Sequence, residues 1–89
     1  MRRYYFHVQD GRDYPDLHGT LLETLDDVKV EAVRFAGDLL SHNGAKFWAG
    51  EEWSMRVTDA MDRTLFVFKF IAVETPTALD DAPEQAMKK

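Results

Sequence analysis

Three aspartates recur at three-residue steps near the N-terminus: Asp10, Asp13 and Asp16. Carboxylates gathered in a loop could bind calcium, but a calcium loop places its oxygen ligands at alternate positions and adds a distant bidentate glutamate. The spacing here does not fit that pattern. Aspartate also forms turns, because its side chain hydrogen-bonds to nearby backbone amides. We therefore expect turn-forming aspartates in this segment and no metal site.

Histidines and serines are the other residues that could support catalysis. His7, His18 and His42 show no i, i+4 pairing of the kind that places two metal ligands on one helix face. Ser41 and Ser54 lack the glycine-flanked elbow of a catalytic nucleophile, and the five glycines form no phosphate-binding loop. The sequence therefore predicts a protein that is not an enzyme and that needs no metal or other cofactor.

The N-terminal segment combines basic and aromatic residues, as single-stranded nucleic-acid binders do. Arg3, Tyr5 and His7 would lie on one face of a strand, and Arg56 could extend this polar strand face. The net charge of −5 opposes binding to a phosphate backbone. Nucleic-acid binding is therefore kept as the alternative function.

The composition is that of one small globular domain. The chain has 89 residues, of which 45% are hydrophobic and 30% charged, enough apolar content for one modest core. Since there is no cysteine, a disulfide scaffold and a thiolate metal site are excluded, which agrees with a reducing cytoplasm. No window is apolar over the ~18 residues that span a membrane, and no secretory signal is evident. We expect a cytoplasmic protein with no membrane partner.

The first half of the chain predicts two strands followed by a helix. Apolar and polar residues alternate over residues 3–9, which is typical of a strand with one buried face. A weaker apolar segment at 19–23 predicts a second strand. Thr24 is a good helix N-cap, with Asp27 as its capping-box partner, and the apolar stripe that follows predicts a helix over 25–42.

The second half predicts two further strands and a tail. Residues 45–52 are expected to form a loop, 53–58 a half-buried strand, and 64–73 a strongly apolar strand. From residue 76 the composition changes to proline, alanine and charged residues, so a single domain over 1–75 and a disordered tail over 76–89 are expected. The order β-β-α-β-β predicts an α+β fold, with one helix packed on one face of an antiparallel sheet.

The last predicted strand is apolar on both faces. Its phenylalanines at positions 66, 68 and 70 point one way, and Leu65, Val67 and Ile71 point the other way. A single helix covers only one face of a small sheet, so the second face needs a different cover. Either the chain covers it, through the loop with Trp48, together with Trp53, or through the tail folded back, or a second protein does.

We therefore expect an interaction module, as a homodimer or bound to another protein. The candidate partner-binding residues are Trp48, Trp53, Leu65, Val67 and Ile71.

The sequence RYYFHVQDG at residues 3–11, followed by a Pro-Asp pair, a glycine and an alanine-bearing amphipathic helix, resembles an uncharacterised family of short bacterial proteins. Members open with R-Y-[FY]-F-H-[VL]-x-D-G and close with a Val-Thr-Asp turn and an apolar strand. The resemblance covers residues 3–73. It implies these domain boundaries and a bacterial cytoplasmic setting, and it implies no activity. Residues 60–62 depart from the family pattern of an acidic residue and a glycine, so a different turn geometry is expected there.

Overall fold

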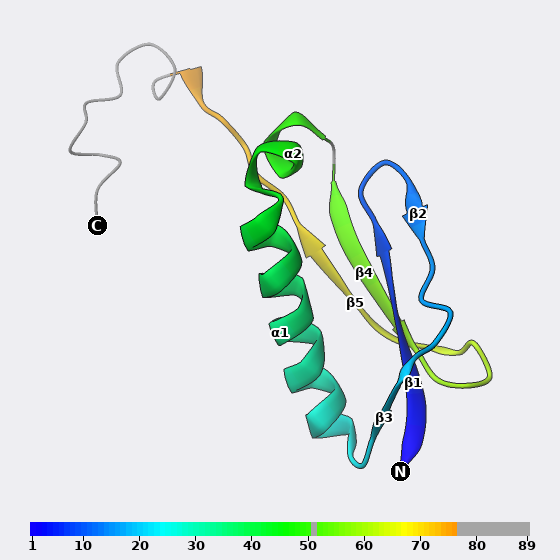
Figure 1. The fold of residues 1–89 in the computed structure, drawn as a ribbon. Helices are drawn as coiled ribbons and strands as arrows, with labels where there is room; N and C mark the ends of the chain where they lie inside the picture. The colour runs from blue at the N-terminus through cyan, green and yellow to red at the C-terminus, as the bar shows by residue number, and fades with distance from the viewer. Residues whose placement is uncertain (51, 77–89) are drawn as a thin grey trace.

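The computed structural model describes residues 1–50 and 52–76. The predicted tail over 76–89 therefore lies, from residue 77 on, outside the described residues. The described residues form five strands and two helices (Figure 1), in the order β1 (Arg2–Gln9), β2 (Asp13–Tyr14), β3 (Thr20–Leu22), α1 (Leu25–His42), α2 (Gly44–Ala49), β4 (Trp53–Thr58) and β5 (Thr64–Phe70).

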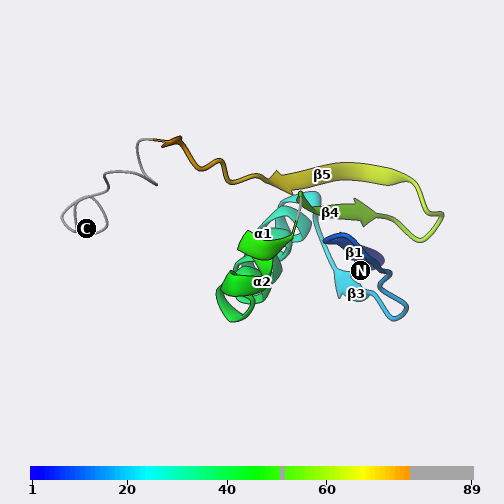
Figure 2. The ribbon, with the colours of Figure 1, turned by 90° about the horizontal axis from the view of Figure 1, so that it is seen from above.

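The strands form one antiparallel sheet in the order β2-β1-β4-β5, and β3 pairs with the other end of β1. β1 and β4 are the central strands, paired from Tyr5 opposite Thr58 to Gln9 opposite Ser54. Both helices lie on one side of this sheet, as the view from above shows (Figure 2). The predicted α+β fold, with an antiparallel sheet and one main helix, is confirmed.

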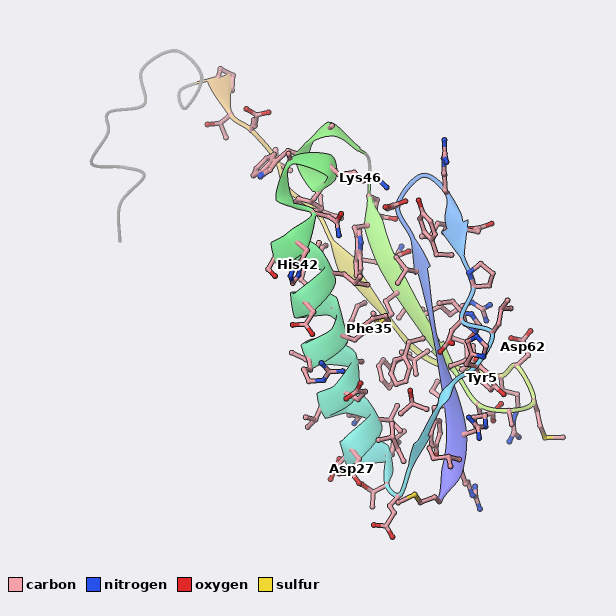
Figure 3. The ribbon with its side chains drawn as sticks, viewed as in Figure 1. Tyr5, Asp27, Phe35, His42, Lys46 and Asp62 are labelled. Carbon is pink, nitrogen blue, oxygen red and sulfur yellow. The ribbon has the colours of Figure 1, made fainter. Side chains whose placement is uncertain are left out.

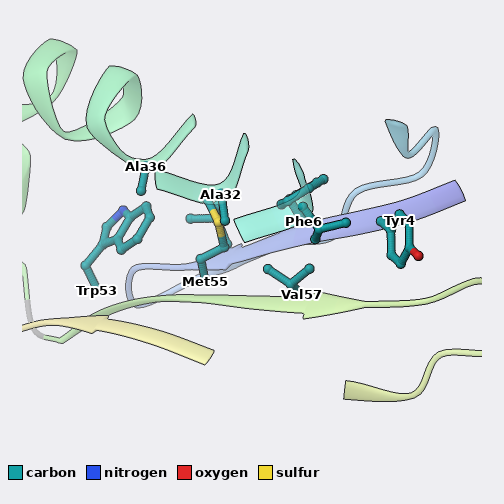
Figure 4. Packing of buried hydrophobic residues seen from close by; sticks show 9 residues of the cluster. Tyr4, Phe6, Ala32, Ala36, Trp53, Met55 and Val57 are labelled. Atoms are coloured by element: carbon teal, nitrogen blue, oxygen red, sulfur yellow. The ribbon is translucent and has the colours of Figure 1, made fainter. Parts of the chain in front are cut away.

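The core lies between α1 and the two central strands (Figure 4). Ala32 and Ala36 are small enough to bring the helix close to Met55 and Trp53. Burial of each large apolar side chain contributes roughly 1.5–3 kcal/mol. The buried hydrophobic residues are Tyr4, Phe6, Val8, Val28, Ala32, Ala36, Trp53, Met55 and Val57.

Helix α1 has the bounds that the sequence predicts. The Thr24 hydroxyl accepts a hydrogen bond from the Asp27 N–H at 3.0 Å, and the Asp27 carboxylate accepts one from the Thr24 N–H at 3.3 Å. This is the capping box, which satisfies backbone donors in the first turn. At the other end, His42 Nδ1 donates to the carbonyl oxygen of Asp38 at 2.7 Å.

Three elements differ from the prediction. The loop expected over 45–52 is wrong in its first part, because the chain restarts after Asn43 as helix α2 and packs Phe47 against the core. β5 ends at Phe70 and not at residue 73, because its partner β4 begins at Trp53, opposite Phe70. β2 was not predicted, since a two-residue strand carries no periodicity.

Candidate functional site

Strand β5 is the edge of the sheet on the side away from β1. It pairs with β4, and no strand that the structure describes pairs with its outer side. On the sheet face opposite the helices, Leu65 is 39% exposed and Val67 is 46% exposed. A seven-residue apolar edge with one charge, Lys69, is the kind of strand that pairs with another chain.

The backbone groups that β5 presents outward follow from one hydrogen bond on β1. The Phe6 N–H points away from β4, toward Asp16. Because backbone direction alternates along an antiparallel strand, Tyr5, His7 and Gln9 bond toward β4. In β4, the residues opposite these three bond toward β1, and the residues between them bond toward β5. In β5, the residues opposite those bond back to β4, so the backbone groups of Val67 and Lys69 point outward.

The ladder between β4 and β5 is irregular at one end. Val57 lies opposite Phe66, but Thr58 lies opposite Thr64, so Leu65 is an extra residue in β5. Such a bulge bends a strand and increases its twist. The regular part of the open edge is therefore residues 66–70.

On the helix side, β5 is only partly covered. Phe66 and Phe68 are half-buried against the core, and Phe70 meets the indole of Trp53 edge-on, with ring centroids 5.4 Å apart. Trp53 itself is 5% exposed. Its side chain is therefore enclosed by the protein's own core and presents little surface to a partner.

The segment that carries Trp48 does not cover the second face of β5. Helix α2 lies on the same side of the sheet as α1 (Figure 2), and its Phe47 packs against the core there. Trp48 and Ile71 instead line a shallow depression beyond the end of β5, and both remain more than half exposed. At the end of the predicted loop, Glu52 lies 3.9 Å from the Lys69 ammonium on that face.

The opposite edge of the sheet is closed by Asp16. β3 pairs with residues 2–4 of β1 and β2 pairs with residues 8–9, so the middle of that edge has no strand partner. The Asp16 carboxylate fills this gap. Its Oδ2 accepts the Phe6 N–H at 3.1 Å, and its Oδ1 accepts the N–H groups of His18 and Gly19 at 3.0 and 2.9 Å.

The His7 side chain, on the sheet face away from the helices, hydrogen-bonds to the same loop at Asp16. Its Nδ1 accepts the Asp16 N–H at 3.0 Å, and its Nε2 lies 3.1 Å from the Thr58 hydroxyl. Because a backbone N–H can only donate, Nδ1 carries no proton, and we assign the proton to Nε2, which donates to Thr58. His7 therefore serves as a structural link between β1, β4 and the loop at Asp16.

Gly19 completes this closed edge. Its φ is +72°, and a Cβ atom there would lie 2.7 Å from Cγ of Arg3 and 2.9 Å from the Tyr4 carbonyl oxygen. Both the backbone conformation and the contact with β1 require glycine.

The environment of Asp16 favours its ionised form. Burial alone would raise the pKa of Asp16, but the N–H groups of Gly19, Phe6 and His18 lower the pKa below its ordinary value. A carboxylate that accepts several backbone N–H groups is stabilised in the charged form.

The predicted polar strand face lies together in space, with its side chains engaged. Tyr5 and His7 are stacked, with ring centroids 6.2 Å apart and an interplanar angle of 8°. Arg3 donates to the His18 carbonyl oxygen at 2.8 Å. Arg56, opposite His7, donates to the Thr64 hydroxyl at 3.2 Å and lies 3.6 Å from the Asp62 carboxylate.

Within residues 1–50 and 52–76, no group of three or more histidine or acidic side chains is placed to hold a metal ion. No helix in the same part of the chain is long and apolar enough to cross a membrane.

Sequence reasoning underestimated Asp16 and Gly19. Asp16 was expected to form a local turn, and it does accept local amides, but it also bonds to a strand ten residues away. The available signal was the Pro-Asp pair and the glycine that follow the opening motif at residues 3–11. Their spacing could have indicated a loop that folds back onto the first strand.

One family model, described as a domain of unknown function (DUF6894), matches residues 3–71. No curated protein and no solved structure matches the chain. The match covers both edges of the sheet, the helices and almost all of the described residues. The chain therefore belongs to the DUF6894 family of domains of unknown function.

Proposed function

We propose that this protein is a non-enzymatic interaction module that self-associates through the open edge of β5. The observation that supports the proposal is the outer side of β5, a seven-residue apolar strand whose Val67 and Lys69 backbone groups lack a strand partner among the described residues. Pairing with an identical strand would satisfy these groups and cover the exposed apolar side chains.

The regular segment 66–70 favours one register for this pairing. In a symmetric antiparallel arrangement centred on Phe68, Val67 would lie opposite the partner's Lys69. The Phe68 rings of the two subunits would then meet, flanked by pairs of Phe66 with the partner's Phe70. Aromatic cross-strand pairs are favourable, whereas a register centred on Lys69 would set two like charges directly opposite each other.

The absence of cysteine makes this register directly testable. Val67→Cys and Lys69→Cys variants, mixed under mild oxidation, should form a heterodisulfide, because their Cα atoms would be directly opposite. Neither variant alone should crosslink efficiently, since its own counterpart would be offset by two residues, about 7–8 Å away and beyond disulfide reach. A homodisulfide of the Val67 variant would instead show that the strand pairing is centred on Val67.

Light scattering after size exclusion separates self-association from its register. A monomer at several hundred micromolar would overturn the proposal. A dimer without the predicted heterodisulfide would leave self-association standing and overturn the register.

Val67→Pro and Val67→Thr form a matched pair for the same edge. Proline removes the outward N–H of Val67, which β4 does not use, so the monomer should fold while dimerisation is lost. Threonine keeps the N–H and the β-branched shape, and its dimer should persist. Loss of dimer in both variants would argue against backbone pairing as the basis of association.

Nucleic-acid binding on the polar strand face is the second candidate. The stacked Tyr5–His7 pair beside Arg56 favours it. The contacts of Arg56 with Thr64 and Asp62, and the net charge of −5, weigh against it. Fluorescence anisotropy with a labelled single-stranded oligonucleotide tests it: binding that weakens with salt and with Arg56→Gln would support this candidate, and no binding at low salt would dismiss it.

A further inference from the structure

A groove lies on the helix side of the sheet, between α1, α2 and the β1–β2 end, away from β5. Its volume is about 600 Å³, within the usual range of small-molecule sites. Phe35 projects from α1 toward the sheet, and Lys46 lies at the α2 end of the same region (Figure 3). The apolar lining of the groove comes mainly from Phe6, Val8, Phe35, Leu39, Phe47 and Trp53.

One carboxylate in this groove has too few partners. The Asp10 side chain is only 20% exposed, and its Oδ1 is buried without a hydrogen-bond donor from any residue that the structure describes. Among the described residues, the contact of Oδ2 is a long one of 3.8 Å with the Lys46 ammonium. Asp16, which also lines the groove, accepts three backbone N–H groups. A buried carboxylate is costly unless donors or a cation satisfy it. Because Oδ1 is enclosed by protein, a ligand in the groove would meet Asp10 at Oδ2, beside Lys46.

The chain's own Lys46 marks where a cation fits. Its Nζ lies 3.4 Å from the Tyr14 hydroxyl and 5.6 Å from the centre of the Tyr14 ring, at the hydroxyl end of the ring, besides its contact with Asp10. A carboxylate and a hydroxyl oxygen side by side are suitable acceptors for an ammonium group. Lys46 occupies this site through long contacts of 3.8 Å with Asp10 and 3.4 Å with Tyr14. The other cation at the groove, Arg34, is bound at 2.6 Å by Glu31 and at 2.9 Å by Asp38.

We infer that this groove binds a small primary amine with an apolar body. The ammonium would replace that of Lys46 between Asp10 and Tyr14, and the apolar body would lie against Phe35 and Phe47. The acidic protein would also attract a cation, since its net charge is −5. This inference is independent of β5, because no β5 residue lines the groove.

The test is an NMR titration of the full chain with 2-phenylethylamine, using 2-phenylethanol and 3-phenylpropionate as neutral and anionic controls. The amine should bind saturably and shift resonances of Val8, Phe35 and Phe47, and the two controls should bind at least roughly tenfold more weakly because they lack the charged donor.

Two variants separate the inference from simple apolar binding. Asp10→Asn should weaken amine binding by roughly tenfold or more, while Lys46→Met, which removes the competing ammonium, should strengthen it. Both should retain the wild-type circular dichroism spectrum; Lys46 is largely exposed, so its variant tests the site even if Asp10→Asn does not fold. Equal binding of the alcohol, weaker binding in Lys46→Met, or no amine binding by wild type at 10 mM, on the order of a weak fragment complex, would each overturn the inference.

Discussion

The two edges of this sheet differ in whether the outward backbone groups of the strand have hydrogen-bond partners. At the β1 edge, two short strands and the Asp16 carboxylate satisfy outward backbone groups, and Gly19 packs directly against the strand. At the β5 edge, a longer and more apolar strand has no strand partner among the described residues. The strands β2 and β3 that form the β1 edge have only two and three residues, whereas β5 has seven, so β5 has the longest unpaired side among the described strands. Since unpaired edges promote association, we expect strand pairing at β5. The first three predictions below test this difference, and the fourth concerns a position away from both edges.

The largest effect is expected from Gly19→Ala at the closed edge. The left-handed backbone and the contacts of 2.7–2.9 Å with β1 should together reduce the free energy of unfolding by roughly 3 kcal/mol. Gly11→Ala is the matched control, because Gly11 also has positive φ, at +97°, but no atom within 4 Å of an added Cβ. Urea unfolding of both variants measures the difference. Equal losses would show that the contact with β1 contributes nothing.

Asp16→Asn should cost roughly 2 kcal/mol at neutral pH, because an amide cannot replace the carboxylate as acceptor for Phe6, His18 and Gly19 together. The effect should depend on pH. The pKa of Asp16 is lowered by folding, so its ionised form stabilises the protein fully above the ordinary value of 3.8, and this contribution is lost as the pH falls through the lower folded pKa.

Unfolding of wild type and Asp16→Asn from pH 7 to pH 2.5, about the range over which carboxylates titrate, checks this sign. The difference between the two proteins should narrow at acid pH. A difference that widens on acidification would contradict the role of the ionised carboxylate.

Amide hydrogen exchange should distinguish the two edges directly. The Phe6 N–H is bonded to Asp16, so its protection should not depend on protein concentration. The Val67 and Lys69 amides point outward, and their exchange should slow by roughly tenfold once most of the protein is dimeric. Concentration-independent exchange at both strands would remove β5 from the interface.

The smallest effect is expected away from both edges. Gly37 lies inside α1 with nothing within 4 Å of an added Cβ, so it does not mediate contact with the sheet. Gly37→Ala should stabilise the protein by up to about 1 kcal/mol through helix propensity alone, without changing the oligomeric state. Thermal unfolding measures the gain, and a loss of stability would reveal a contact that a second subunit makes with this face of the helix.

The sequence alone determined the elements whose signals are local. The bounds of α1 follow from the capping box at Thr24 and Asp27, and the strands at β1 and β4 follow from the alternation of buried and polar residues. The doubly apolar character of β5 was also evident, because it needs only the side-chain types along one strand.

Tertiary structure decided which strands pair with each other and which strand lies at an edge of the sheet. That β5 lies at an edge depends on the pairing of β1 with β4, which joins residues about fifty positions apart, and no local pattern records such a pairing. The same holds for Asp16, whose turn residues could be read from the sequence but whose bond to Phe6 could not. Local physics fixed the strands and the helix, whereas long-range hydrogen bonding selected which edge was closed and which was left open.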